Sequence, residues 1–424
     1  MTRARICVPR GTIAITRRTV ERKLLWTPSD ARVEQCLLYA LAAAQERERL
    51  EVHHGCLMPN HGHWIWTPGH ETNLGEALRF FHRESARARQ EDLLARGYDA
   101  PQQIWDRRST HVMHLLDSGA VLEQILYQHL NPPKAGLVER TCDYPGFVSP
   151  LSLLKGGTIV VPKPDVYFGE DQPAERELVL TPPPELVRLF GSDLEGLVYW
   201  LEKSVDVQER AMAKARTRPV VGAERLKRIH PFAEPATCRE RRGRRTPRWK
   251  VGRGWLPADR RELLKHLRAE DQRFLDEHAE QWARWTAGDR SVAFPFGTLQ
   301  MVAQHGAAMA AEHLDAVLAS ADRTSLWVSA PCSPRDAVAL AAGAAIEALD
   351  EEGDDAERSD PEPRSDASRA AGDGATRAEG PEGQREDVET RGLASPVTTA
   401  DDEHARRLVT LRDRRRGGGR APDS

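Results

Sequence analysis

The segment EVHHGCLMPNHGHWIWTP, residues 51–68, decides the fold that we expect for this chain. Two strand-like runs, at about 51–58 and 61–67, stand on either side of a tight turn at Pro59-Asn60 and predict a β-hairpin. Side chains i and i+2 of a strand share one face, so His61 and His63 can point at the same ion. The alternative is that two histidines fell in one strand by chance.

The flanking sequence predicts further strands and helices. Alternation over 11–20 and over about 104–115 indicates strands. Helices are expected from Asp30 to about Arg49, from Asn73 to Gly97, and from Asp117-Ser118 to Pro132-Pro133, because each begins at a helix-capping residue. Strands and helices in this order favour an α+β fold, with helices on one face of an antiparallel sheet.

The third expected helix carries two polar residues with a shared direction. Tyr127 and Asn131 are four residues apart, so they lie on one helix face. Val121, Leu122 and Ile125 define a different, apolar face. A single tyrosine in such a place is more often a half-buried packing residue than a functional one.

Three segments together resemble a known family. CLMPNHGHWIW (56–66) is similar to the LMPNHxHLL segment of the single-tyrosine HUH transposases, and most similar to that of the REP-associated tyrosine transposases. ILYQHLNPPKAGLVERTCDYPGF (125–147) resembles their YIxxNPVKAGLV…DYPWSS segment, and TIAITRRTVERKLLW (12–26) resembles their first strand. The resemblance covers roughly residues 8–150.

The resemblance implies a ferredoxin-like α+β domain that cuts and rejoins single-stranded DNA. His61 and His63 match the family's metal ligands, Asn131 matches a third metal contact, and Tyr127 matches the nucleophile. Two positions depart from the pattern. Gly62 replaces a bulky apolar residue, which weakens the strand and its packing, and Pro133 replaces a valine.

Phosphodiester chemistry explains why these residue types would act together. A divalent ion can polarise a phosphate oxygen while a tyrosine hydroxyl attacks the phosphorus and forms a phosphotyrosine. Mixed nitrogen and oxygen ligands favour Mg²⁺ or Mn²⁺ for this task, although Zn²⁺ also suits histidine. We expect single-stranded or hairpin DNA as the partner, and a monomer or a homodimer. A Cys/His zinc site at His54 and Cys56 is conceivable, but buried strand residues are the commoner use.

Arginines mark the surfaces where DNA would bind. Arg79, Arg83 and Arg87 repeat every four residues on the second helix, and we expect a phosphate-binding stripe beside the active site. A solvated helix face is the plain alternative. Further candidates are Arg107, Arg108, Arg241, Arg242, Arg244 and Arg245. Trp64, Trp66 and Trp105 could stack on unpaired bases, but core packing is the commoner use of tryptophan.

The formal net charge of −3 over 424 residues conceals blocks of opposite sign. Residues 214–253 hold 14 basic and 3 acidic groups, and residues 347–390 hold 5 basic and 16 acidic ones. The sequence therefore predicts a transposase-like domain over 1–155, a mostly helical extension over 156–330 with a basic segment at 214–253, and an acidic, largely disordered tail over 331–424 with a basic end.

Several classes of protein are disfavoured. The six cysteines form no C-x-x-C pair, and no apolar run is long enough for a membrane span. The N-terminus resembles no secretion signal, so we expect a cytoplasmic protein that associates with the nucleoid through DNA. The leading hypothesis is a transposase or single-strand endonuclease. The alternative is a decayed or domesticated transposase that only binds structured DNA; a replication initiator fits the YxxxNP context less well.

Overall fold

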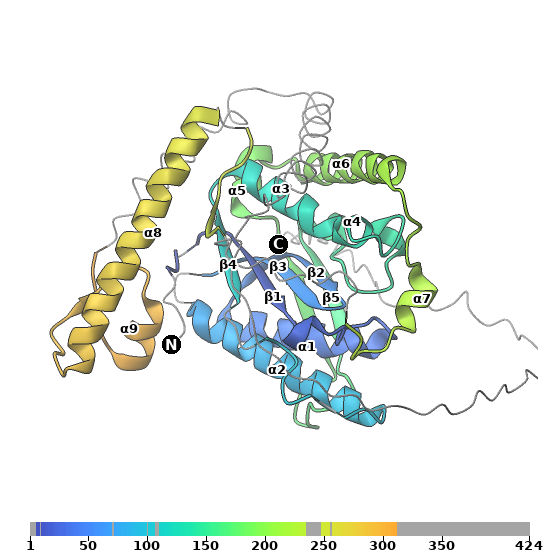
Figure 1. Cartoon of the computed structure of the whole chain (residues 1–424), viewed down its shortest axis with the longest axis horizontal. Coiled ribbons are helices and arrows are strands. Elements are labelled where there is room, and N and C mark those ends of the chain that lie inside the picture. The colour runs from blue at the N-terminus through green and yellow to red at the C-terminus, as the bar shows by residue number, and fades with distance from the viewer. Residues whose placement is uncertain are drawn as a thin grey trace, which may run out of the picture. The chain divides into compact units, whose positions relative to one another are not determined.

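A seven-stranded sheet forms the centre of the computed structural model, which describes residues 6–8, 10–69, 72–99, 101–106, 110–234, 247–254 and 257–311 (Figure 1). In spatial order the strands are β5 (Gly157–Pro162), β6 (Glu175–Leu180), β2 (Glu51–Met58), β3 (His61–Thr67), β1 (Ile13–Arg18), β4 (His111–Leu115) and β7 (Trp249–Lys250). The β2–β3 hairpin is antiparallel and has the predicted bounds. Within this sheet, β2 pairs with β6 and β4 with β7 in parallel, and the other described neighbours are antiparallel.

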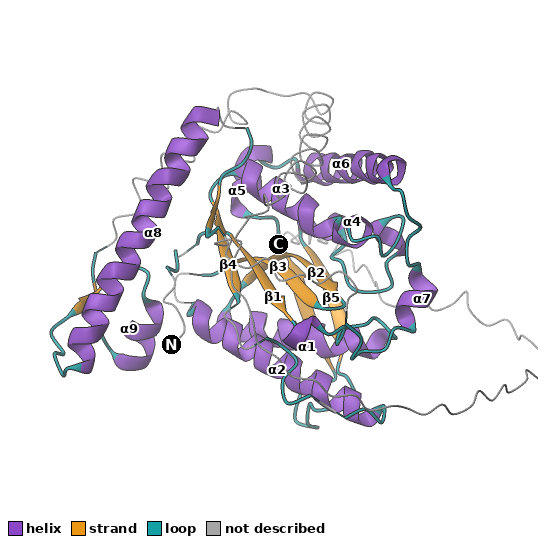
Figure 2. Cartoon of the chain, viewed as in Figure 1, coloured by secondary structure: helices purple, strands orange, loops and turns teal. Residues whose placement is uncertain are grey.

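Helices cover both faces of this sheet (Figures 1 and 2). On one face lie α1 (Ala31–Glu48) and α2 (Leu74–Ala95). The helices of the other face are α3 (Ser118–His129), the short α4 (Asn131–Lys134), α5 (Pro184–Phe190) and α6 (Leu194–Ala215). The predicted caps are present: the side chains of Asp30, Asn73 and Asp117 accept hydrogen bonds from backbone amides of α1, α2 and α3.

The α+β fold class is confirmed, but the expectation of helices on one face is wrong. Ile13, Ile15, Trp64 and Trp66 pack against α1 and α2. The intervening strand residues Ala14 and Ile65 are also apolar and pack against α3, α5 and α6. Because the central strands bury both of their faces, a second layer of helices has to cover the second face.

This alternation of side chains decides where the histidines point. Trp64 and Trp66 face α1 and α2, so His61, His63 and Ile65 face α3. The two histidines and the tyrosine helix therefore lie on the same side of the sheet.

The sheet continues past residue 155. β5 and β6 extend it beyond β2, and their residues Val161, Leu178 and Leu180 belong to the same core as α1. At the opposite edge, β7 pairs with β4. Within the described residues, short 3₁₀ helices occur at Val20–Arg22, Thr141–Asp143 and Leu151–Lys155.

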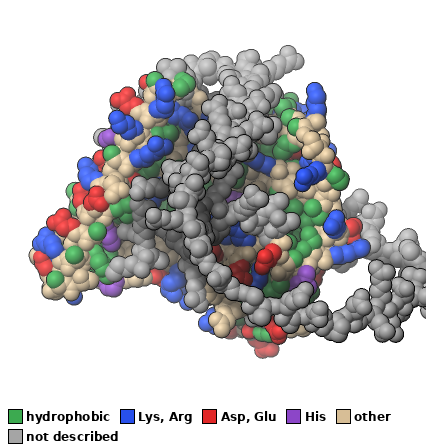
Figure 3. All heavy atoms as spheres, viewed as in Figure 1, with side chains coloured by type: hydrophobic (Ala, Val, Ile, Leu, Met, Phe, Trp, Pro, Cys, Tyr) green, Lys and Arg blue, Asp and Glu red, His purple; other side chains and the backbone are tan. Residues whose placement is uncertain are grey.

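The remaining described elements belong to the C-terminal part of the extension. They are α7 (Ala223–Lys227), α8 (Pro257–Thr286), α9 (Leu299–His305) and a two-stranded sheet of β8 (Ala293–Phe294) and β9 (Ala308–Met309). Only Leu267 and Phe274 of α8 are buried, and acidic and basic side chains cover much of this helix (Figure 3). The backbone amide of Cys7 donates to the carbonyl of Gly297, which ties the N-terminal segment to the extension.

Candidate active site

His61 and His63 form a pair on the face of β3 that looks toward α3. Their ring centroids are 4.7 Å apart and the rings are nearly perpendicular. Burial lowers the pKa of His61 to about 4, with a smaller contribution from the positive charges of Arg18 and Arg22. Burial and then the neighbouring His61 hold the pKa of His63 well below its usual value. Both rings are thus kept neutral, the form in which imidazole binds a metal ion.

Hydrogen bonds to Nδ1 fix the orientation of both rings. Nδ1 of His61 lies 2.7 Å from Oδ1 of Asn60, and this amide oxygen accepts the Nδ1 proton. Nδ1 of His63 lies 2.9 Å from Oγ1 of Thr16, the residue opposite it on β1. Nε2 of His63 is buried without a hydrogen-bond partner among the described residues. A buried nitrogen without a hydrogen-bond partner costs free energy unless another group binds it. A cation would bind it in this way.

Tyr127 lies next to this pair. Its ring centroid is 5.9 Å from that of His63, and the two rings meet edge to face. The tyrosine is 42% exposed although it belongs to a helix whose other residues are mostly buried. The side chain of Tyr127 is therefore accessible to a large polymer such as DNA.

Lys134 lies beside the tyrosine, and no role for it was predicted from the sequence. Its Nζ lies 5.2 Å from the centre of the Tyr127 ring. Tyr127 belongs to α3 and Lys134 to α4, so their spacing in the sequence did not reveal the contact. Arg18 and Arg22 were missed as well, because the pairing of Arg18 with His61 depends on the register of β1 and β3.

Asn131 is the expected third ligand, and it is buried at the start of α4. It follows Tyr127 by four residues, but α3 ends at His129, so the two residues do not share one helix as predicted. Nδ2 of Asn131 has no hydrogen-bond partner among the described residues. Across that part of the chain, no group of three or more His, Cys, Asp or Glu side chains could hold a metal ion. A third protein ligand beside the two histidines would therefore be of another type, and an amide oxygen fits that requirement.

A second histidine pair anchors the tyrosine helix to the sheet. Nε2 of His54, on β2, lies 3.3 Å from Nδ1 of His129, on α3. Burial lowers the pKa of His54 to about 3 and that of His129 to about 4, so the bond joins two neutral rings. Cys56 is fully buried opposite His63, and burial raises the pKa of its thiol. His54 and Cys56 are thus buried strand residues.

Gly62 has a packing role that the sequence did not reveal. A Cβ atom built on Gly62 would lie 3.2 Å from Nε1 of Trp64, and one built on Gly55 would lie 2.4 Å from the same indole. Trp64 therefore spreads over both glycines and fills the volume that a bulky residue at position 62 would occupy. Trp64, Trp66 and Trp105 are all buried, so they are core residues and not exposed stacking platforms.

The arginine stripe is not where we expected it. Arg79, Arg83 and Arg87 lie on the outer surface of α2, which packs on the face of the sheet opposite to α3. The prediction that they flank the active site is wrong, since the side of the sheet that α2 covers could not be read from its own sequence. The predicted tail over 331–424 lies outside the described residues. So do the other predicted DNA contacts, which are Arg107, Arg108, Arg241, Arg242, Arg244 and Arg245.

No protein-family model matches the chain, and no curated protein matches its sequence. Two solved transposase structures resemble part of it. One is a REP-associated tyrosine transposase bound to a REP hairpin, with 21% identity and a TM-score of 0.28, covering 34% of this chain and 81% of the other. The second is a candidate transposase from Deinococcus radiodurans R1, with 17% identity and a TM-score of 0.22, covering 27% of this chain and 85% of the other.

None of the helices in the described ranges has the length and apolarity that crossing a membrane requires.

Proposed function

We propose that this protein is a transposase-like enzyme that cuts and rejoins single-stranded DNA, with Tyr127 as the nucleophile. The observation that carries the proposal is the meeting of His61, His63 and Tyr127 on one face of the sheet, from two segments that also resemble a tyrosine-transposase pattern. An exposed hydroxyl beside two oriented, neutral histidines is the arrangement that covalent phosphoryl transfer needs.

The chain's own residues account for most of the steps. The Tyr127 hydroxyl loses its proton as its oxygen attacks the phosphorus, and one P–O bond of the DNA breaks. The leaving DNA oxygen takes up a proton and becomes a hydroxyl, and the phosphotyrosine keeps the phosphoester for the reverse reaction. Lys134, Arg18 and Arg22 supply positive charge around the phosphate.

His61, His63 and Asn131 would hold a divalent cation, for which Mg²⁺ and Mn²⁺ are our first candidates. When bound, such an ion would polarise a non-bridging phosphate oxygen. The donor set supports this, because His63 Nε2 is buried without a partner among the described residues and both rings are fixed through Nδ1.

A covalent-adduct assay tests the proposal. The full chain is incubated with Mn²⁺ and single-stranded oligonucleotides that carry hairpins from the DNA flanking its gene, and adducts are detected by their shift in a denaturing gel. The wild type should form an adduct, and Tyr127→Phe should bind the DNA without forming one. An adduct that persists in Tyr127→Phe would reject this nucleophile. Binding without any wild-type adduct would favour the alternative, a transposase derivative that only binds structured DNA.

A further inference from the structure

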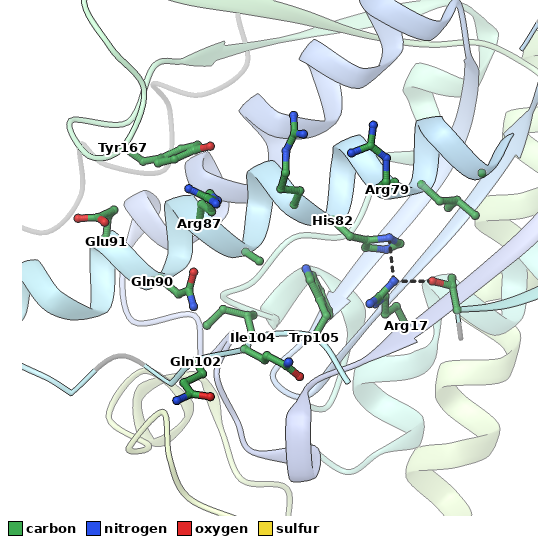
Figure 4. Close-up of a pocket in the computed structure, with 16 residues that line it drawn as sticks. Arg17, Arg79, His82, Arg87, Gln90, Glu91, Gln102, Ile104, Trp105 and Tyr167 are labelled. Atoms are coloured by element: carbon green, nitrogen blue, oxygen red, sulfur yellow. Dashed lines mark hydrogen bonds between the residues drawn. The ribbon is translucent and has the colours of Figure 1, made fainter. Parts of the chain in front are cut away.

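A basic pocket of about 630 Å³ lies along the outer side of α2 (Figure 4). Because α2 and α3 pack on opposite faces of the sheet, this pocket and Tyr127 lie on opposite sides. The walls of the pocket are the outer side of α2, the segment 102–105 and the end of β1. Four of its lining residues are arginines: Arg17, Arg79, Arg83 and Arg87. This volume falls in the range of roughly 300–1,000 Å³ that is typical of ligand sites, and the charge favours an anion.

Arg17 forms the fixed end of the pocket. Its Nη1 donates to Oγ1 of Thr110 at 2.8 Å, and its Nη2 donates to the carbonyl of Asp106 at 3.1 Å. Nη1 also lies 3.3 Å from Nδ1 of His82, which must accept because a guanidinium can only donate. The guanidinium is therefore held in place before any ligand arrives, which reduces the entropy lost on binding.

The three arginines of α2 line another side of the pocket, and their guanidinium groups are held less firmly than that of Arg17. Their four-residue spacing separates them by about 6 Å along the helix, comparable to the distance between neighbouring phosphates of an extended strand. Arg79 pairs with Glu76 and Arg83 with Glu84, but both arginines are exposed, and such surface pairs contribute little. Arg87 makes no ion pair with any described residue. Phosphates can therefore compete for these guanidinium groups.

The rest of the lining suits nucleotide bases. Gln102 and Gln103 offer amide groups that can donate to and accept from base edges. Gln90 already donates from its Nε2 to the carbonyl of Pro101, so it offers chiefly its amide oxygen. Tyr167 stands at one end of the pocket, 37% exposed, with its hydroxyl bonded to Glu84 at 2.9 Å. Its backbone φ of +66° is unfavourable for a residue with a Cβ, and such strain concentrates at functional positions. A basic groove with an accessible aromatic ring is typical of proteins that bind single strands.

We propose that this pocket binds unpaired nucleotides of the DNA on which the enzyme acts, at a position separate from the cleavage site. This inference rests on the proposed function and adds a recognition site to it. Arg17 and Arg18 are neighbours at the end of β1, and they pair with Gly62 and His61 respectively on β3. Arg17 points into the pocket and Arg18 points toward the histidines, so one strand passing the end of β1 could reach both.

Equilibrium binding tests the pocket. The probe is a fluorescein-labelled oligodeoxythymidine of about 20 nucleotides, measured by anisotropy with the full chain at several salt concentrations. Arg83→Ala/Arg87→Ala should raise the Kd at least about tenfold and reduce the salt slope by about 1.4, or about 0.7 for each lost phosphate contact. The matched control is Arg188→Ala/Arg210→Ala, which removes two exposed arginines from α5 and α6 and should change neither value.

Cross-linking locates the bound strand directly. The same probe with 5-iododeoxyuridine should attach to Tyr167, the exposed aromatic residue of the pocket, under ultraviolet light. The proposal would be overturned if both double variants raised the Kd equally, or if the wild type did not bind the probe. Cross-links that form only outside the pocket would also overturn it. Adduct formation at Tyr127 with an unchanged Kd in Arg83→Ala/Arg87→Ala would reject the pocket alone. A Kd that responds as expected, without any adduct, would reject only the cleavage mechanism.

Discussion

The indole of Trp64 lies over Gly62, with Nε1 only 3.2 Å from the place where a Cβ on Gly62 would stand. The strand that carries the two histidines therefore obtains its packing from a neighbouring residue instead of from position 62. Gly62 departs from the family pattern, but it is not a gap in the core.

Adding a side chain at Gly62 should destabilise the fold. Gly62→Val should lower the free energy of unfolding by about 1–3 kcal/mol, since the added methyl groups overlap the indole. Trp64→Ala should lower it by about 3–5 kcal/mol. In the double variant, the loss in free energy of unfolding should be smaller than the sum of the two single losses by at least about 1 kcal/mol. The reason is that the valine enters space that the indole has left. Denaturant unfolding measures all three, and strictly additive losses would contradict the contact.

Removing the ammonium group beside Tyr127 should slow the chemistry more than it weakens DNA binding. Lys134→Met should reduce the rate of adduct formation about 100-fold, by analogy with the loss of one charge-stabilising donor. Lys134→Arg should recover part of the rate, since it restores the charge. The matched control is Lys203→Met, because Lys203 sits 5.3 Å from the ring of Tyr199 on α6 in the same type of contact. A rate that falls equally in both variants would remove the special role of Lys134.

Local sequence signals predicted much of the fold. The capping residues Asp30, Asn73 and Asp117 and the Pro59-Asn60 turn act within a few positions of themselves, so helix starts and the β2–β3 hairpin could be predicted closely. The pairing of Tyr127 with the histidines came from the family resemblance, and the structure places Tyr127 beside His63.

Long-range geometry could not be predicted in this way. The side of the sheet that α2 covers depends on the pairing of whole elements, so the position of Arg79, Arg83 and Arg87 was misjudged. Arg17 and Arg18 face opposite sides of the sheet because they are neighbours on one strand. That Arg18 lies beside His61 follows from the register of β1 with β3, which no nearby residue reveals.

The hydroxyl of Thr16 should matter for metal binding through the ring that it orients. Thr16→Val removes the hydrogen bond to His63 Nδ1 but keeps the shape of the side chain. Loss of such a supporting contact typically costs about 10–100-fold in metal affinity, so calorimetric titration with Mn²⁺ should give a Kd at least about tenfold higher. Thr158→Val, in the distant strand β5, serves as the control and should leave the Kd unchanged. Equal Kd values for Thr16→Val and the wild type would show that Thr16 does not orient the ring.

Asp92 should be among the most sensitive stabilising residues of the α1–α2 layer. Its carboxylate is fully buried and accepts hydrogen bonds from Arg32 at 2.6 Å, from Arg96 at 2.8 Å and from the buried Arg89. Asp92→Asn keeps the size of the side chain but leaves the buried guanidinium of Arg89 without its counter-charge. Breaking a buried pair in this way typically costs about 3–5 kcal/mol.

The chain offers a closely matched control for that loss. Asp165 binds the same Arg32 at 3.3 Å, but its side chain is 74% exposed. Asp165→Asn should therefore change the free energy of unfolding by less than about 1 kcal/mol, as is usual for surface pairs. Urea unfolding of both variants, followed by tryptophan fluorescence, gives the comparison. If both variants lost the same free energy of unfolding, burial could not be what makes the Asp92 network strong. The α1–α2 layer would then depend on its apolar contacts alone.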